Sequence, residues 1–93
     1  KIPFISCARK YAEKGCFAGG AFDNKKHFEP KVKFAESIDE ENQMLLFDPQ
    51  TSGGLLLGIP QEKLDAFIAR AEELDQAVWE IGRVETGAGI KVV

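Results

Sequence analysis

The sequence contains few of the residues that metal sites and membrane spans require. His27 is its only histidine, and its two cysteines, Cys7 and Cys16, are nine positions apart and form no CxxC pair. A zinc site would need more ligands than these, and the longest uninterrupted apolar stretch is far too short to span a bilayer. We therefore expect no metal site, no membrane span, and two reduced and mostly buried thiols in a cytoplasmic protein, with a redox or catalytic thiol as the alternative.

An excess of positive charge is also missing. The 12 lysine and arginine residues stand against 15 aspartate and glutamate residues, which gives a net charge of −3. Because nucleic acids usually bind a basic face, this balance argues against a nucleic-acid partner, although a nucleotide would need only a local site. The spacing of a phosphate-binding P-loop is absent as well. With 93 residues, of which 44% are hydrophobic, the chain is predicted to be one small domain, residues 1–93.

The most informative stretch is a loop-like segment between two apolar runs, Met44–Phe47 and Leu55–Ile59. Its residues are Asp48, Pro49, Gln50, Thr51, Ser52, Gly53 and Gly54. The proline fixes its own φ, and the two glycines can adopt positive φ and allow another group to approach the backbone. The hydroxyls and the loop amides could line a concave anion site. Two interpretations stand: a tight turn between neighbouring strands, in which Asp48 bonds its own turn backbone, and a loop that faces a ligand.

Hydrophobic spacing predicts the elements around this loop. Two helices are expected, Pro3–Lys14, which Gly15 should stop, and Pro60–Leu74. The expected strands are Pro30–Ile38, Gln43–Phe47, Leu55–Ile59, Ala77–Val84 and Ile90–Val93, with the last two in a hairpin. Leu55–Ile59 begins with three consecutive leucines, which predict a strand that is covered on both faces.

Two polar segments are predicted to be irregular. Cys16–Asn24 holds Gly19 and Gly20, which could mark a turn or a close backbone approach, although a solvated loop is the simpler interpretation. Asp39–Asn42 is predicted to be an acidic, solvated connector, with a metal site as the less common alternative. The whole order predicts an α+β fold, with a mixed, largely antiparallel sheet and two main helices packed on one face.

The amino-acid sequence of the central loop resembles that of a known family. Asp-Pro-Gln-Thr-Ser-Gly-Gly at positions 48–54, followed by an apolar strand, is similar to the C-terminal domain of the selenophosphate synthetases (selenide, water dikinases). These enzymes belong to an ATP-dependent superfamily that also includes aminoimidazole ribonucleotide synthetase. The likeness extends to Gly19, Gly20 and Asn24 and to the segment Ile81-Gly82-Arg83-Val84. Ala21 departs from the pattern, since the family commonly has threonine there, so no hydroxyl is available at this position.

The resemblance implies a role within a longer enzyme. The family makes selenophosphate from selenide, ATP and water and releases AMP and phosphate, with magnesium, in a two-domain protein that works as a homodimer. Its catalytic lysine, its cysteine or selenocysteine and its magnesium-binding aspartates lie in the N-terminal part, and nothing here matches them. Residues 1–93 would then be the later part of the C-terminal domain, without catalytic residues of their own and inactive alone. The N-terminal ATP-binding domain would be their partner, and ATP and magnesium would be bound by the complete enzyme, not tightly by this fragment.

By the same resemblance, a set of loop residues should face the substrate or nucleotide in the cleft between the domains. These residues are Asp48, Gln50, Thr51, Ser52, Gly53, Gly54, Gly19, Gly20 and Asn24. The glycine amides and the two hydroxyls are the expected donors, and Asp48 is expected to organise the loop and not to bind metal. One alternative is a free-standing interaction or small-ligand-binding domain that docks a partner through an edge strand or the Leu64–Leu74 helix face. Another is a different activity of the superfamily, aminoimidazole ribonucleotide synthesis or thiamine monophosphate phosphorylation.

Overall fold

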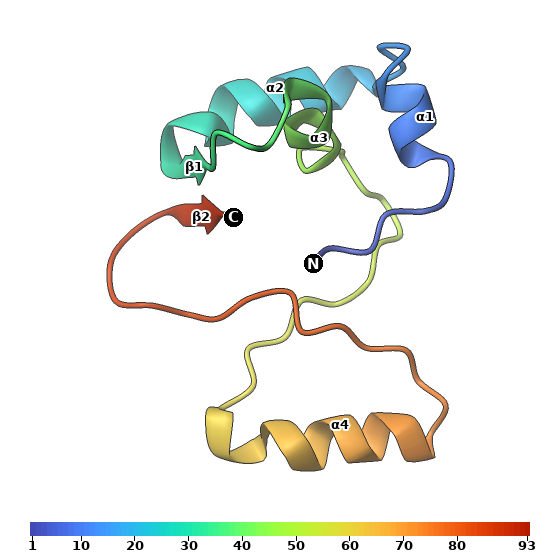
Figure 1. Ribbon diagram of the computed structural model, residues 1–93, viewed down its shortest axis with the longest axis vertical. Coiled ribbons are helices and arrows are strands. Elements are labelled where there is room, and N and C mark those ends of the chain that lie inside the picture. Colours follow the sequence, from blue (N-terminus) through green and yellow to red (C-terminus); the bar gives the residue numbers. More distant parts are fainter. The chain divides into compact units, whose positions relative to one another are not determined.

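The computed structural model describes residues 1–93, which divide into two compact units. The larger unit comprises Phe4–Gly53 and Thr86–Val93, and the smaller unit comprises Lys1–Pro3 and Gly54–Glu85. The larger unit holds helices α1, α2 and α3 with strands β1 and β2, and the smaller unit holds helix α4 (Figure 1). Helices and strands are thus mixed, as predicted. None of the helices is long and apolar enough to cross a membrane.

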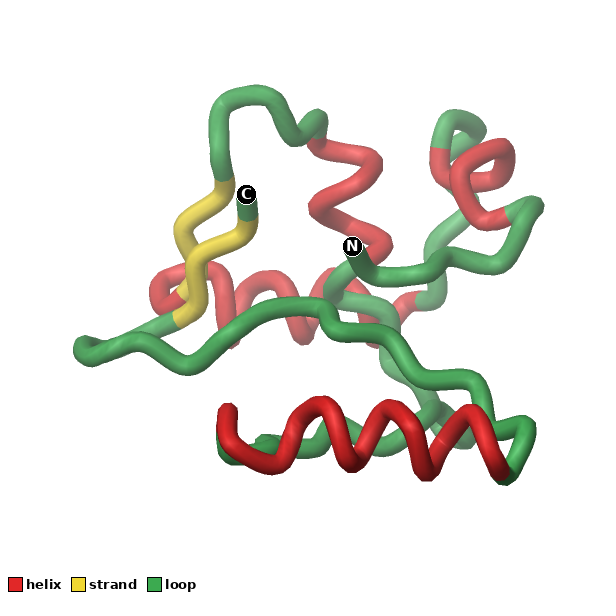
Figure 2. Tube along the Cα trace, turned by 60° about the horizontal axis from the view of Figure 1, so that its bottom comes forward, coloured by secondary structure: helices red, strands yellow, loops and turns green.

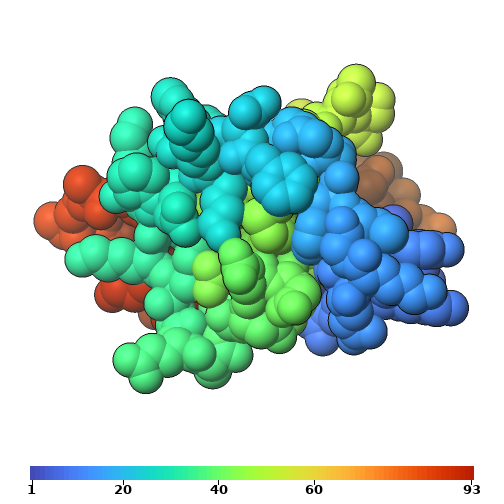
Figure 3. Space-filling view, turned by 90° about the horizontal axis from the view of Figure 1, so that it is seen from above, coloured from blue at the N-terminus to red at the C-terminus, as the bar shows by residue number.

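Three helices form the core of the larger unit. α1 spans Ala8–Ala12, α2 spans Gly19–Phe28 and α3 spans Glu40–Leu45. Both α1 and α2 contact α3, and the surfaces of α2, in turquoise, and α3, in green, adjoin in Figure 3. The buried side chains of this core are Ala12, Ala21, Met44 and Phe47. Because the alanine side chain is small, α1 and α2 can each approach a neighbouring helix closely.

The first two helices differ from the prediction. Cys16–Asn24 was expected to be irregular, but α2 begins within it, directly after an extended Ala18. The predicted helix Pro3–Lys14 is reduced to α1, and Gly15 stops it with φ of +70°, as predicted. Two adjacent glycines lower local helix propensity, so the sequence pattern concealed the start of α2.

A helix, α3, replaces the predicted strand Gln43–Phe47. Asp39 is its N-cap, and Oδ1 of this residue accepts a hydrogen bond from the backbone N–H of Asn42 at 2.8 Å. Two glutamates follow in the first turn, where the helix dipole favours anions. The acidic residues of Asp39–Asn42 are exposed, as predicted, but the prediction of a connecting loop is wrong, because these residues cap and begin a helix.

The sheet is a single parallel pair. β1 spans Val32–Phe34 and β2 spans Ile90–Val92, and the two strands run side by side in Figure 2. One further bond extends the pairing, since the N–H of Ala35 donates to the C=O of Val92 at 2.9 Å. The predicted largely antiparallel sheet is wrong, because β2 returns to β1 through a connection long enough for a parallel crossover.

Two other predicted strands are extended segments without a strand partner. Leu55–Ile59 and Ala77–Val84 belong to no sheet, and the side chains of Leu55 and Leu56 are 89% and 81% exposed. The expected cover on both faces of the first segment is therefore wrong. The expected hairpin of the second is wrong as well, because Ile90–Val92 pairs with β1 instead.

The helix of the smaller unit agrees with the prediction. The 3-10 turn η2, Gln61–Lys63, leads into α4, Leu64–Glu73, seen in gold in Figure 1. Ala71 is the buried side chain of α4, and half-buried apolar side chains lie one turn before it on the same face. The predicted helix Pro60–Leu74 is confirmed, with the two end residues serving as caps.

Both cysteines are exposed and form no disulfide. Cys7 is the N-cap of the short α1, and Cys16 follows the turn at Gly15, where its thiol lies 3.9 Å from the C=O of Lys14. The prediction of mostly buried thiols is wrong, because both residues flank a five-residue helix instead of lying on its packed face.

Candidate functional site

The predicted site loop follows α3 through a tight turn and is exposed along its whole length. The backbone N–H of Gln50 donates to the C=O of Asp48 at 3.0 Å, and each residue from 48 to 54 is exposed. The turn bond comes from the Asp48 carbonyl and not from its carboxylate. Neither flank of the loop is a strand, so the interpretation as a turn between neighbouring strands is wrong.

The donors of the loop have no partner inside the chain. The hydroxyls of Thr51 and Ser52 make no hydrogen bond to the protein, and neither do the backbone N–H groups of Gly53 and Gly54. Because these groups are exposed, water satisfies them in the free chain. A ligand with acceptor oxygens could replace that water without breaking any bond of the fold.

The two loop glycines have different surroundings. A Cβ at Gly53 would lie 2.7 Å from Oε1 of Gln50, so the Gln50 side chain folds over this glycine. A Cβ at Gly54 would have no neighbour within 4 Å, and neither glycine has a positive φ. The fold of the chain therefore does not require glycine at position 54, either for backbone conformation or for space.

One face of α2 contacts the beginning of the loop. Nδ2 of Asn24 donates to the C=O of Phe47 at 2.9 Å, in a part-buried position. A Cβ at Gly20 would lie 3.1 Å from Cγ and 3.3 Å from Cβ of Pro49. Gly20 and Asn24 are four positions apart and hence share one helix face. The structure thus brings two of the predicted α2 residues to the loop, and Gly20 makes the close backbone approach that its residue type suggested.

Gly19 is placed differently. It is the first residue of α2, and a Cβ there would have no neighbour within 4 Å. Ala18, the N-cap, supplies no side-chain hydrogen bond. The first N–H groups of α2 therefore have no side-chain cap, at an end where the helix dipole is positive. Unlike Gly20, Gly19 therefore has open space where a side chain would lie.

The lysine next to Asn24 is engaged by carboxylates. Nζ of Lys25 lies 3.0 Å from Oε1 of Glu40 and 3.9 Å from Oε1 of Glu29. The contact with Glu40 connects α2 to the first turn of α3. The cation therefore supports helix packing, although its place in the sequence, shortly after two glycines, is typical of phosphate-binding segments.

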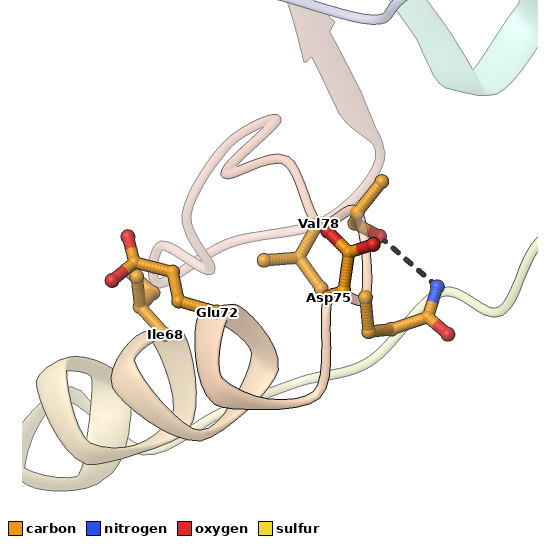
Figure 4. Close-up of a pocket in the computed structure, with 6 residues that line it drawn as sticks. Ile68, Glu72, Asp75 and Val78 are labelled. Atoms are coloured by element: carbon orange, nitrogen blue, oxygen red, sulfur yellow. Dashed lines mark hydrogen bonds between the residues drawn. The ribbon is translucent and has the colours of Figure 1, made fainter.

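A separate hollow lies in the smaller unit, at the end of α4 (Figure 4). Its volume is about 420 Å³, and its lining consists of Ile68, Glu72, Asp75, Gln76, Ala77 and Val78. Figure 4 shows Glu72 on the helix and Asp75 on the segment that follows it. No third metal-binding side chain joins these two carboxylates. None of the predicted site residues lies here. No sequence pattern indicates the hollow, because it forms just after the end of the helix, at Asp75 with its positive φ.

A protein-family model matches most of the chain. The family model described as "AIR synthase related protein, C-terminal domain" matches residues 11–93. This range includes α2, the loop from 48 to 54 and every element that follows. No solved structure matches the chain significantly.

Curated relatives match over most or all of the chain. A selenide, water dikinase of Carboxydothermus hydrogenoformans is 38% identical over 93 residues, 100% of this chain and 27% of the relative. One from Caldanaerobacter subterraneus is 40% identical over 85 residues, 90% of this chain and 24% of the relative. One from Myxococcus xanthus is 41% identical over 96 aligned positions, 100% of this chain and 27% of the relative. The chain thus spans about a quarter of the length of these relatives.

Proposed function

The chain belongs to the family of AIR synthase related protein C-terminal domains, and on this premise we propose that it forms the later part of the C-terminal domain of a selenide, water dikinase. The complete enzyme would convert ATP, selenide and water to selenophosphate, AMP and phosphate. In this proposal it is a cytoplasmic homodimer, and the partner of residues 1–93 is the N-terminal ATP-binding domain of the same polypeptide. The isolated chain is then inactive.

In this proposal, the N-terminal domain and residues 1–93 contribute differently to the binding of magnesium and ATP. We assign the magnesium to the N-terminal domain, where the resemblance to the selenophosphate synthetases places the magnesium-binding aspartates; in residues 1–93 no group of three or more metal-binding side chains is found. The exposed hydroxyls and amides of the loop do fit phosphate oxygens, which accept hydrogen bonds. The contribution of this chain to ATP is therefore hydrogen bonding and positioning.

We assign the nucleotide- or phosphate-facing role to the loop Asp48–Gly54. The observation that carries this assignment is the run of exposed donors from Thr51 to Gly54, none of which has a hydrogen-bond partner inside the chain. At the end of this run, Gly54 leaves room for a group from outside the chain, since a Cβ there would have no neighbour within 4 Å. The unpartnered donors beside it supply the chemistry, because donors fixed near developing phosphate charge stabilise the transition state of phosphoryl transfer. Asp48 contributes its carbonyl to the turn and serves to organise the loop.

Replacement of Gly54 by alanine, in the polypeptide as its gene encodes it, tests this role. A methyl group there meets nothing in the chain, so the fold should be unchanged. We expect selenide-dependent ATP consumption to fall about tenfold or more in kcat/KM, which corresponds to about 1.4 kcal/mol. Gly58→Ala is the matched control, because a Cβ at Gly58 also has no neighbour within 4 Å and the residue lies outside the loop.

The outcome is read from activity and thermal unfolding together. Loss of activity in Gly54→Ala with an unchanged Tm, and full activity in Gly58→Ala, supports the ligand-facing loop. Full activity in both variants would falsify it. An equal loss in both would show that any added methyl group disturbs the enzyme, which also removes the support for the loop.

The exposed leucines favour a second candidate, a free-standing interaction domain. Leu55, Leu56 and Leu57 are 89%, 81% and 54% exposed, and such apolar surface is typical of docking sites. The gene sequence upstream of Lys1 separates the two candidates. An aspartate-bearing ATP domain preceded by a glycine-rich segment with a lysine and a cysteine or UGA codon supports the enzyme. A start codon directly before Lys1 supports the interaction domain.

A further inference from the structure

We propose that Asn24 and Gly20 are positioning residues, which hold the first residues of the loop Asp48–Gly54 against α2 so that the loop's donors meet their ligand at a fixed place. The inference rests on the proposed function of that loop and adds residues that do not touch the ligand themselves. It is carried by two contacts between the same helix face and the two residues on either side of Asp48.

The first contact fixes the carbonyl directly before the loop. Phe47 is 7% exposed, and its ring packs edge-to-face on Phe34 with centroids 5.9 Å apart. The core thus fixes the side chain of Phe47, and the hydrogen bond from Nδ2 of Asn24, at 2.9 Å, fixes the backbone C=O of Phe47. Because a peptide unit is planar, the orientation of this carbonyl also sets the orientation of the N–H of Asp48.

The second contact fixes the residue directly after Asp48. The ring of Pro49 lies against the backbone of α2 at Gly20, where a Cβ would be 3.1 Å from Cγ of the proline. A proline ring cannot turn away as a flexible side chain would, since it is closed on its own backbone nitrogen. Any side chain at position 20 would therefore push the loop away from the helix.

The two contacts divide the loop into a held base and a free tip. Residues 47 and 49 are tied to α2, whereas the donors from Thr51 to Gly54 make no hydrogen bond within the chain. The position of the tip is then set by the position of the base. α2 itself is held by the buried Ala21 and by the ion pair of Lys25 with Glu40, so its face is a fixed support.

The geometry is tested first, without reference to activity. Gly20→Cys and Pro49→Cys are combined in a Cys7→Ser, Cys16→Ser background, because both native thiols are exposed. The Cβ positions, 3.3 Å apart, are near the range of a disulfide. We expect mild oxidation to join positions 20 and 49, detected by mass spectrometry of the linked peptides. Absence of this link in the folded protein would overturn the inference.

The functional test compares two single-atom exchanges on neighbouring positions of α2, in the polypeptide as its gene encodes it. Asn24→Asp keeps the shape of the side chain but removes the donor to Phe47. Asp23→Asn is the matched control, because the side chain of Asp23 is exposed and makes no hydrogen bond. We expect Asn24→Asp to lower kcat for selenide-dependent ATP consumption by about tenfold to a hundredfold, the effect of a small misplacement of reacting groups. KM for ATP should change less than kcat, because the donors act mainly on transition-state charge.

A second pair of variants asks whether the contact at Gly20 acts through the loop. Gly20→Ala should lower kcat, and addition of Pro49→Ala should restore part of it, since this removes Cγ, the nearest atom. Equal kcat values in Asn24→Asp and Asp23→Asn, or no recovery in the double variant, would contradict the positioning role. If Gly54→Ala also keeps full activity, the proposed function of the loop has failed; if Gly54→Ala is inactive while Asn24→Asp is active, only the present inference has failed.

Discussion

At the scale of single residues, Asp39 decides how the segment before the loop folds. Oδ1 of this residue accepts from the backbone N–H of Asn42 at 2.8 Å, and both carboxylate oxygens accept from Nδ2 of the same asparagine. One of the orphan backbone donors of α3, the N–H of Asn42, is thereby satisfied by an exposed cap. The direction in which α3 leaves this cap determines where Phe47 and the loop begin.

Replacement of Asp39 by alanine should lower the free energy of unfolding by about 0.5–2 kcal/mol, because an N-cap acceptor is lost. Urea denaturation followed by circular dichroism measures the change. Asp39→Asn is the control, since asparagine caps helices about as well and should retain nearly all of the stability. Equal stability of the alanine and asparagine variants would contradict the capping role.

The sequence identified the residues at the loop better than it identified their structure. Gly20, Asn24 and the segment from 48 to 54 were singled out, and the structure places the first two against the third. The pattern Gly20…Asn24 has helical spacing, yet two glycines in succession indicated a loop because glycine is a poor helix former. The reason for glycine at position 20 is its contact with Pro49, a tertiary contact that no local pattern reveals. The ligand-facing role remains a prediction.

At the scale of elements, α3 shows why a short apolar run is ambiguous. Four apolar residues in succession fit a buried strand or one turn of a buried helix. Met44 and Phe47 are three positions apart and are 4% and 7% exposed, whereas the two residues between them are half-buried. This is the periodicity of a helix face, but it becomes visible only in the burial and not in the residue types.

Truncation of Met44 tests the core that α3 forms with α1 and α2. Met44→Ala should lower the free energy of unfolding by about 2–5 kcal/mol, the usual cost of a cavity at a buried position. Met44→Leu conserves the volume and should cost less than about 1.5 kcal/mol. Thermal denaturation of the two variants measures the difference. Similar Tm values for both would contradict the assignment of Met44 to the core.

The sheet shows the limit of sequence reasoning for non-local contacts. The strand at Val32–Phe34 and the one at Ile90–Val92 were each predicted within longer segments. Their pairing was not, because the nearest apolar segment, Ala77–Val84, offered a simpler local partner. A hairpin is indicated by neighbouring residues, whereas a parallel pair depends on how the whole intervening chain folds.

At the scale of the whole molecule, apolar surface outside the core is the main departure from an ordinary small domain. Large apolar side chains are exposed in both units, among them Leu55, Leu56 and Val84 at 89%, 81% and 96%. Consecutive leucines predicted a buried strand, and within residues 1–93 nothing buries them. The residue types indicate that these side chains should be buried, but they do not indicate which other residues would bury them.

Exchange of Leu56 for serine should separate association from stability. Because this side chain is 81% exposed, the free energy of unfolding of the 93-residue chain should change by less than about 0.5 kcal/mol. Concentration-dependent association should decrease, since apolar surface is removed. Sedimentation velocity measures the association, and urea denaturation measures the stability. A loss of stability as large as that of Met44→Ala would show that Leu56 is part of a core.

The parallel pairing of β1 with β2 has a consequence for the order in which the chain acquires its structure. The helices α1, α2 and α3 lie in one continuous stretch, 8–45, and can assemble from local contacts. β2, by contrast, must find β1 across the 55 intervening residues 35–89, a closure with a higher entropic cost. During synthesis, a nascent chain that ends before Ile90 carries all three helices and the loop but no sheet. Within residues 1–93 the pairing then forms after the helices, and cleavage that separates Ile90–Val92 from β1 would undo it while leaving the helices assembled.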